Sequence, residues 1–497
     1  MAVVLLCAAA SACGNGGAPA KVKEDAAAHA PPPTAIALPA LGVDKLARFN
    51  SIYGDGAAAY AKALAAYKAK ARDWVAVRAG CEAALAKDAF HFDAHYLLAA
   101  ALAQAGDAAG AADHLATALA GDFFAYAGDY PASEDFAAFR AAPQGKAIDD
   151  LFTRIRAAYV AASQHGLWLV ARRSPFKWPA KDGVQFGATR GELYAYDRTA
   201  KRYLRLTHTD HQVAGFVVGP ATGAVALLGF DKVDHEGGEQ PPLVARAWLE
   251  TRDPATWQPL APRVTLPSAR AVAVGFGAGD SLLAATAPAT GRWTLGEWTT
   301  YAVDATTKKL AKVAQPLPAP RVELTLDEGR VVRVPAIDGV AADWTGDPPT
   351  AASLKIGATA IAVPESGRAA HDSVALAPGG ASVAFATAVD PCAKDVLPSL
   401  YVADAKTGAL RHVLTAKSRF AARWLDGTTL AYDDGDGGIR LWDAATGREI
   451  ERLVNAPGIA LDALSLATGT CKPAPVETAG SGDELPPEEP TGSGSAR

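Results

Sequence analysis

The spacing of apolar residues changes once along the folded part of the chain, and the two spacings predict different structures. From about residue 57 to 160, apolar positions recur every three or four residues, as they do on one face of an α-helix. After Gly166 they alternate with polar positions between turns rich in Gly, Pro and Asp, which is typical of short β-strands. The sequence therefore predicts a multidomain chain, with a helical region followed by an all-β region.

The helical region contains an internal repeat with an offset of 34 residues. The recurring residues are Asp73 and Asp107, Leu64 and Leu98, Ala84-Leu85 and Ala118-Leu119, Asp88 and Asp122, and Phe90 and Phe124. This period, and the pattern from Leu98 through Gly106-Asp107 to Leu119, resemble the tetratricopeptide repeat over about residues 57–125. The resemblance implies two antiparallel helices per repeat. Two repeats bury too little apolar surface alone, so residues 135–160 are expected to supply capping helices.

One sequence motif recurs in the all-β region: a strand of alternating apolar residues, an aspartate, and a short turn that ends in Gly or Lys. The aspartates of the copies are Asp197, Asp304, Asp404, Asp443 and, in a weaker copy, Asp253. The carboxylate can accept hydrogen bonds from the amides of the turn, and glycine tolerates the positive φ of a tight reversal. A second motif that predicts a hairpin precedes most copies of the first. Two hairpins per unit predict a four-stranded sheet every 40 to 50 residues, which is the period of a propeller blade.

The Trp442-Asp443 copy and the segment from His371 to Ala384 resemble WD-repeat and TolB-type β-propellers. Counting units between residues 165 and 471 predicts six four-stranded blades, with seven as the alternative. Residues 459–467 form one further apolar segment. We expect it to add a strand to the first blade, because an unclosed propeller would leave a sheet edge exposed to other chains.

The first twelve residues form a short apolar run that ends in small residues, as secretory signals do. Ala10-Ser11-Ala12-Cys13 resembles the lipobox of bacterial lipoproteins. The resemblance implies cleavage before Cys13, acylation of its thiol and a lipid-anchored location in the bacterial cell envelope. Gly14 then favours the outer membrane, with the folded domains in the periplasm or at the cell surface. The alternative is an ordinary cleaved secretory signal.

Changes in composition along the chain predict the domain boundaries. Residues 1–12 are the signal, 13–40 an Ala- and Pro-rich disordered tether, 41–162 the helical domain, 165–471 the propeller and 472–497 a disordered acidic tail. The formal net charge is −5, which excludes the basic field that nucleic acid requires. No apolar run reaches the roughly 18 residues of a transmembrane helix.

Five cysteines are present, and an exported chain meets an oxidising compartment. Cys7 falls in the signal, Cys13 in the lipobox and Cys81 on a helix. We therefore predict a disulfide between Cys392 and Cys471 that fastens the closing strand. Two free thiols are the alternative.

The sequence contains few candidate catalytic or ligand-binding residues. The sequence lacks a nucleophile elbow, a His-Glu-x-x-His helix and a phosphate-binding loop. A propeller would bring three polar segments to one face near the channel mouth: His208-Thr209-Asp210-His211, His235-Glu236 and His371-Asp372. They could hold a metal or a ligand carboxylate, or they could bond turn backbones. We favour the second interpretation, and we predict no catalytic residue, metal or cofactor.

These features predict a non-enzymatic envelope lipoprotein that acts as a scaffold for contact with other envelope proteins. One alternative is a metal-dependent propeller enzyme that uses His208, Asp210, His211 and His235. Another is a propeller that binds a small ligand or glycan through exposed aromatic residues, for which the candidates are Trp293, Trp298 and Trp344.

Overall fold

The structure is a computed structural model, and it describes residues 56–465 apart from short gaps. The gaps are 166, 173–175, 180–184, 189, 199–201, 236–239, 292–293, 319–320, 328–329, 336–338, 347–349, 365–366, 388–396, 416–420, 434–437, 454–458 and 462–463. The predicted signal, tether and tail, and with them Cys13 and the Cys392–Cys471 disulfide, lie outside the described residues. Within the described part of the chain, no helix is long and apolar enough to cross a membrane.

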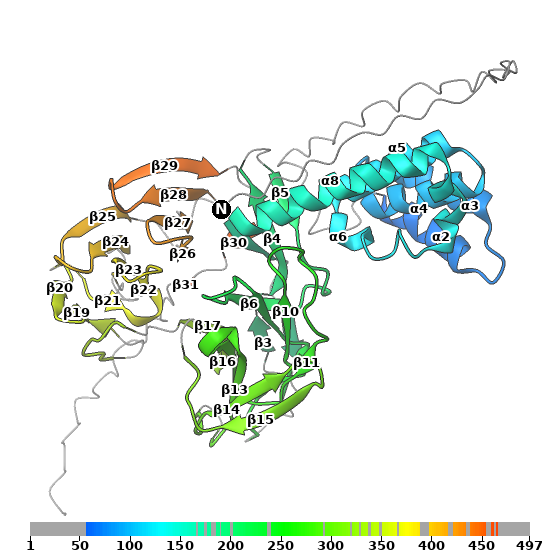
Figure 1. Ribbon diagram of the computed structural model, residues 1–497. Coiled ribbons are helices and arrows are strands. Elements are labelled where there is room, and N and C mark those ends of the chain that lie inside the picture. Colours follow the sequence, from blue (N-terminus) through cyan, green and yellow to red (C-terminus); the bar gives the residue numbers. More distant parts are fainter. Residues whose placement is uncertain are drawn as a thin grey trace, which may run out of the picture. The chain divides into compact units, whose positions relative to one another are not determined.

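The N-terminal region is helical, as the periodicity predicts (Figure 1). Its elements are α2 (Ala57–Lys68), α3 (Trp74–Leu85), α4 (Phe92–Gln104), α5 (Ala108–Gly121), α6 (Phe123–Tyr126), the 3-10 turn η2 (Glu134–Phe136), α7 (Ala137–Ala141) and α8 (Pro143–His165).

The 34-residue offset has a local physical cause. Asp73 is the N-cap of α3 and accepts a hydrogen bond from the Ala76 amide at 3.0 Å. Asp107 caps α5 in the same way, from the Gly110 amide at 2.9 Å. Each carboxylate satisfies an amide that the first helical turn leaves without a partner. Gly106, at a φ of 79°, ends α4 in the left-handed conformation that glycine tolerates.

Alanine and leucine form the core between these helices. Leu98, Leu115 and Leu119 are buried, and Ala63, Ala84, Ala111 and Ala118 are fully buried where helices approach closely. The long helix α8 packs on α5 through Ile155 and Tyr159, which are fully buried. As expected, the segment after the repeats covers the last repeat helix.

The remaining described chain forms a propeller-like arrangement of four sheets with four or more strands, which we name A to D. Sheet A contains β1 (Leu167–Arg172), β4 (Gly191–Asp197), β5 (Arg202–Arg205), β6 (Val213–Val218), β7 (Val225–Gly229), β10 (Trp248–Arg252), β11 (Val264–Thr265) and β30 (Ile459–Leu461). Sheet B contains β2 (Phe176–Pro179), β3 (Gln185–Ala188), β12 (Ala271–Phe276), β13 (Leu282–Ala287), β14 (Thr299–Asp304), β15 (Lys309–Val313), β16 (Arg321–Asp327) and β17 (Arg330–Pro335).

Sheets C and D are smaller, and three two-stranded sheets complete the described set. Sheet C contains β22 (Ala375–Leu376), β23 (Ser382–Ala386), β24 (Ser399–Asp404) and β25 (Leu410–Thr415). Sheet D contains β26 (Ala421–Trp424), β27 (Thr429–Asp433), β28 (Ile439–Asp443), β29 (Arg448–Leu453) and β31 (Leu464–Ser465). The pairs are β8 (Lys232–Asp234) with β9 (Leu243–Ala245), β18 (Thr350–Ala351) with β21 (Ala369–Ala370), and β19 (Ser353–Ile356) with β20 (Thr359–Ala362).

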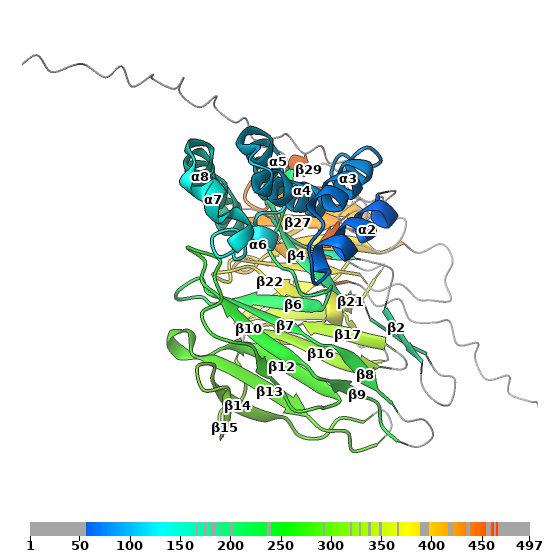
Figure 2. The ribbon, with the colours of Figure 1, turned by 90° about the vertical axis from the view of Figure 1, so that its right-hand side faces the viewer.

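The predicted count of six or seven blades is wrong, because neighbouring units join into continuous sheets. In sheet A, β6 pairs with β4 at Val213 and Gly191, so the first two units share one sheet. In sheet B, β16 pairs with β12 over five positions and adds the start of the fourth unit to the third (Figure 2). The rest of the fourth unit is split between two-stranded sheets. A hairpin signal identifies strands that are adjacent in sequence, but it does not show which hairpin edges pair.

The predicted closing strand is present. β30 pairs with β1 of sheet A, with Leu461 opposite Leu169, and β31 pairs with β26 of sheet D. An Arg198–Glu451 ion pair also joins the first sheet to the last. The C-terminal segment therefore covers an edge of both sheets.

The aspartate turns follow the predicted chemistry. Asp404 accepts hydrogen bonds from the Lys406 and Thr407 amides at 2.9 and 2.8 Å, and Gly408 closes the turn at a φ of 71°. Asp443 and Gly447 repeat this arrangement. These hydrogen bonds stabilise the ionised carboxylates, and they lower the pKa of Asp404 and of Asp443.

One copy of the turn carries a strained residue. Lys308 occupies the position of Gly408 and has a φ of 56°. Left-handed backbone costs a residue with a Cβ about 1–2 kcal/mol. Glycine lowers that cost but adds entropy to the unfolded chain. We expect Lys308→Gly to raise the free energy of unfolding by about 0.5–1 kcal/mol in urea denaturation.

A substitution in the opposite direction, at the equivalent position of another turn, provides the control. Gly408→Ala is expected to destabilise the protein, because the added Cβ would lie 2.9 Å from the Ala360 carbonyl oxygen and φ is positive. A lower stability of Lys308→Gly than of the unmodified chain would refute this explanation of the turn.

Candidate functional site

The histidine-rich segment predicted as a channel-mouth cluster forms a tight loop between β5 and β6. Asp210 and His211 both have positive φ values, 57° and 58°. Such backbone is strained in residues that carry a Cβ, and it persists where surrounding contacts hold it. Several of those contacts come from one carboxylate, that of Glu192 on β4.

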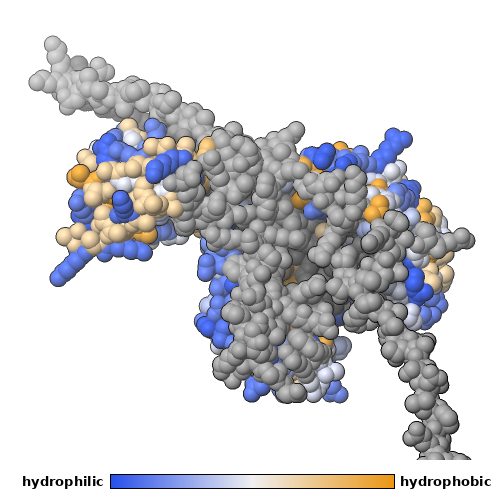
Figure 3. All heavy atoms as spheres, turned by 180° about the vertical axis from the view of Figure 1, so that it is seen from behind, coloured by the Kyte–Doolittle hydropathy of each residue, from blue (hydrophilic) through white to orange (hydrophobic). Residues whose placement is uncertain are grey.

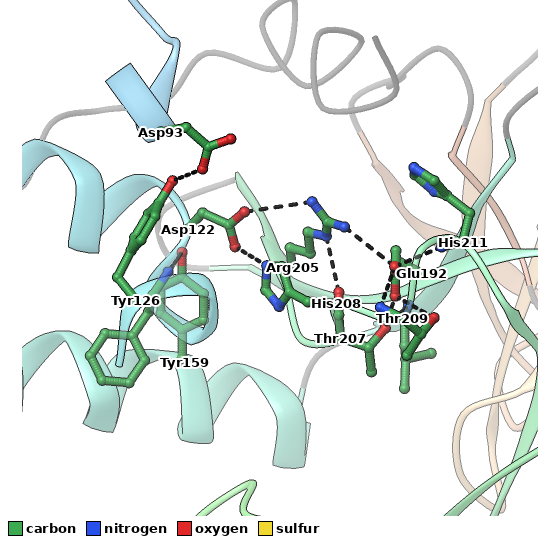
Figure 4. Close-up of polar contacts among 12 residues, drawn as sticks. Asp93, Asp122, Tyr126, Tyr159, Glu192, Arg205, Thr207, His208, Thr209 and His211 are labelled. Atoms are coloured by element: carbon green, nitrogen blue, oxygen red, sulfur yellow. Dashed lines mark hydrogen bonds and ion pairs between the residues drawn. The ribbon is translucent and has the colours of Figure 1, made fainter. Parts of the chain in front are cut away.

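Glu192 is fully buried and accepts hydrogen bonds from across the loop (Figure 4). Its Oε1 accepts from the backbone amides of Thr209 at 2.6 Å and His211 at 2.9 Å. Its Oε2 accepts from the hydroxyl groups of Thr207 at 2.6 Å and Thr209 at 3.0 Å. A buried carboxylate is stable only when its oxygens are paired in this way, so Glu192 and the loop determine each other's conformation.

Arg205 supplies the positive charge that Glu192 needs. Its Nη2 donates to Glu192 Oε1 at 3.3 Å, and its Nε donates to the Thr207 carbonyl at 3.0 Å. Burial alone would lower the pKa of Arg205, but the neighbouring Asp122, Tyr194 and Glu192 together raise it above the ordinary value. The guanidinium is therefore firmly charged, with a side chain that is only 7% exposed.

The other partner of Arg205 belongs to the helical region. Asp122 directly follows α5, and its Oδ2 lies 3.6 Å from Arg205 Nη1. Its Oδ1 accepts a hydrogen bond from His208 Nε2 at 2.7 Å. Figure 4 shows Asp122 between the helices and the β5–β6 loop, with Arg205 linking it to Glu192. We call Asp122, Glu192, Arg205 and His208 the junction network.

An apolar core continues across the same junction. Leu193, Leu204 and Leu206 of the first sheet belong to one buried cluster with Leu119 and Tyr159 of the helices. Trp257, also in this cluster, is fully buried and donates its indole N–H to the Leu206 carbonyl at 2.6 Å. Asp122, Glu192 and Arg205 are thus buried beside this core, where charge pairs are screened little by solvent, whereas His208 lies at the exposed border of the network.

The structure separates most of the residues predicted to converge. His208 contacts Asp122, whereas Asp210 is exposed and His211 is buried with its backbone amide on Glu192. Figure 4 shows the His208 and His211 rings well apart.

The other predicted residues belong to different elements. His235 follows β8 in a separate two-stranded sheet, and Glu236 lies outside the described residues. His371 begins the 3-10 turn η4 (His371–Ser373), which includes Asp372, and its ring meets Trp344 edge-on at 4.8 Å.

Sequence reasoning missed the three most important members of the network, Glu192, Arg205 and Asp122. Two signals were available. Glu192 directly precedes the apolar run from Leu193 to Tyr196, Arg205 lies between Leu204 and Leu206, and Asp122 is the repeat partner of Asp88. Asp88 bonds the Phe90 amide of its own turn. Only the three-dimensional structure shows that Asp122 contacts the β-region instead.

The chemistry of the junction network is structural. Its carboxylates are paired with a guanidinium, an imidazole, hydroxyl groups and amides, an arrangement that fixes backbone rather than exposing a reactive group. Among the described residues, no group of three or more His, Cys, Asp or Glu side chains is placed to hold a metal ion.

Comparisons with known proteins give only distant likenesses. No protein-family model matches the chain, and no curated protein matches it. A crystal structure of the tricorn protease matches 58% of this chain at 13% identity with a TM-score of 0.34, and this chain covers 26% of that protein. TolB from Acinetobacter baumannii matches 65% of this chain at 12% identity with a TM-score of 0.28, covering 69% of TolB. Saccharomyces cerevisiae Sqt1 matches 56% of this chain, and 72% of its own, at 12% identity and a TM-score of 0.25. Because these TM-scores lie below 0.5, none of the likenesses assigns a family or a function.

Proposed function

We propose that the protein is a non-enzymatic cell-envelope lipoprotein, anchored through Cys13 in the outer membrane, that binds other envelope proteins. Its tetratricopeptide-like helices and its propeller-like sheets are the two binding scaffolds. The observation that carries the proposal is the exposed apolar surface of the first helical hairpin.

This surface is made of small apolar residues at helical spacing. On α2 the exposed residues Ala58, Ala61 and Ala65 share one face, and Ala63 is the helix's buried residue. On α3, Val75 is 81% exposed, and Ala79 and Ala83 follow it at intervals of four. In Figure 3 the helical region, at the left, shows pale orange spheres, the colour of weakly hydrophobic residues, interspersed with blue hydrophilic ones.

In a stacked helical array such a face is covered by the next repeat. An exposed apolar face on a helical hairpin favours protein contact, because burying it releases water at little entropic cost from short side chains. The adjacent Arg78 and Glu82 pair with each other at 2.8 Å, and Lys62 and Lys68 of α2 are also exposed, so the surface carries a positive charge beside its apolar residues.

Site-specific crosslinking in native envelopes tests the proposal. A photoreactive residue at Ala61 or Ala79 is expected to give a discrete adduct with one envelope protein, and Ala65→Glu or Ala83→Glu is expected to abolish it. The matched control carries the photoreactive residue at Thr306, which is equally exposed but lies in a turn of sheet B. Equal labelling at all three positions, or no adduct at Ala61 and Ala79, would rule out this surface as the binding site.

A further inference from the structure

A second feature lies in sheet B, remote in sequence from the junction network. Five residues stand side by side across five strands: Glu323 on β16, Ala273 on β12, Ala285 on β13, Thr300 on β14 and Val313 on β15. Residues directly opposite in neighbouring strands share a face of the sheet. The three inner positions are two alanines and a threonine, so this face has short side chains at its centre, with Glu323 and Val313 at its borders.

A pocket of about 530 Å³ lies over this row. The segment 314–317 after β15 forms part of its wall, and Leu317 packs against Ala273 and Ala285. Trp298, immediately before β14, also lines the pocket and is 40% exposed. The volume lies within the range of small-molecule sites, about 300–1,000 Å³.

The charged wall of the pocket comes from β16. Arg321 and Glu323 both line it, with an Nε–Oε2 separation of 3.8 Å, which is longer than a hydrogen bond. Arg321 Nη1 donates to the Leu317 carbonyl at 3.0 Å and ties the wall segment to the strand. Burial raises the pKa of Glu323, whose side chain is 14% exposed, and the neighbouring Arg321 guanidinium partly offsets that rise.

These groups together suit one class of ligand. An aromatic ring provides a platform for an apolar C–H face, while a carboxylate, a guanidinium and a hydroxyl group provide acceptors and donors for a ring rich in hydroxyl groups. A lipid chain is disfavoured, because it would remove water from Arg321 and Glu323 and offer no hydrogen bond to either group. A saccharide of one or two rings presents the required apolar face and hydroxyl edge.

We propose that this pocket binds a saccharide, with a sugar ring against Trp298 and its hydroxyl groups on Glu323, Arg321 and Thr300. The site is independent of the protein-binding surface on α2 and α3. It gives the propeller-like region a small-ligand activity in addition to its scaffold role.

Isothermal titration of the purified chain with a panel of glucose, galactose, N-acetylglucosamine and its disaccharide tests the proposal. At least one probe is expected to bind with a Kd of about 10 mM or tighter. Trp298→Ala and Glu323→Gln are each expected to weaken that binding by about tenfold or more.

Leu295→Ala is the matched control, because Leu295 is 38% exposed, lies three residues from Trp298 and is not part of the pocket lining. It is expected to leave binding unchanged. Trp298→Ala removes an exposed side chain, and an unaltered thermal midpoint confirms that it folds. The proposal is overturned if no probe in the panel binds, or if a bound probe is held equally well by Trp298→Ala.

Discussion

Arg205→Ala is expected to lower the free energy of unfolding by about 3–5 kcal/mol, the range for removing one partner of a buried charge network. The substitution leaves the carboxylates of Asp122 and Glu192 in an apolar surrounding, with side chains 8% and 0% exposed. Glu192 keeps its amide and hydroxyl donors, and Asp122 keeps His208. The charge of Glu192 then lacks a cation within the network. Urea denaturation measures the loss.

Two variants separate this effect from a general loss of an arginine. Arg205→Lys keeps the charge, but its single nitrogen cannot reach Glu192, the Thr207 carbonyl and Asp122 as the three guanidinium nitrogens do. The stability of this variant should therefore lie between those of the unmodified chain and Arg205→Ala. Arg78→Ala removes an arginine from an exposed pair with Glu82, whose side chains are about half exposed, and should lower the stability far less than Arg205→Ala does. Equal losses of stability in Arg205→Ala and Arg78→Ala would show that the junction network stabilises the fold no more than an exposed ion pair does.

Lowering the pH from about 6.5 to 4 is expected to destabilise the helical region through two packed histidines. His95 on α4 and His114 on α5 share a hydrogen bond between their Nδ1 atoms at 2.8 Å. His95 Nε2 lies 3.1 Å from the Ala89 carbonyl, which can only accept, so that nitrogen carries the proton. In the neutral pair His95 Nδ1 therefore accepts from His114 Nδ1, and the pair cannot hold two extra protons.

The direction of the pH effect follows from the pKa shifts. Burial lowers the pKa of His95 from 6.5 to about 4, and burial lowers that of His114 as well. Between these two pH values the unfolded chain binds protons that the folded chain excludes, so stability falls as the pH falls. At about 1.4 kcal/mol per pH unit, His95 alone accounts for at most about 3 kcal/mol.

Urea midpoints measured from pH 7.5 to 4 test this prediction. His95→Gln is expected to flatten the pH dependence, because the amide side chain does not titrate. His91 accepts a hydrogen bond from the Ala94 amide, and burial lowers its pKa as well. Some pH dependence of stability should therefore remain in His95→Gln. A pH dependence that is identical in His95→Gln and the unmodified chain would refute the role of this pair.

Local features of the fold could be predicted from the sequence, because each depends on a few neighbouring residues. The N-cap aspartates of α3 and α5 produce the repeat offset, and Asp404 and Gly408 form the turn that their motif predicts. The closing strand was also predictable, since an unpaired edge must be covered. Which strand edges join, as at Val213 and Gly191, depends on long-range geometry that hairpin signals do not contain.

The candidate site was predictable only in its location. The segment from His208 to His211 was selected as a candidate site because its side chains could bind a ligand or bond turn backbones. Its actual contacts differ: Glu192 accepts from the segment's own backbone amides, and the His208 side chain bonds the Asp122 carboxylate. Its partners come from β4 and from the end of α5, and no local pattern connects those positions. The pocket of sheet B could not be predicted from the sequence either, since it arises from the strand register that aligns Ala273, Ala285 and Thr300.

The central structural claim is that the helical region and sheet A fold as one unit through the junction network and their shared core. Native-state hydrogen exchange tests it most directly. The slowest amides of α5 and of β4 should report the same opening free energy, and Arg205→Ala should lower both by the same amount. Different opening free energies for α5 and β4, with α5 unaffected by Arg205→Ala, would contradict the claim.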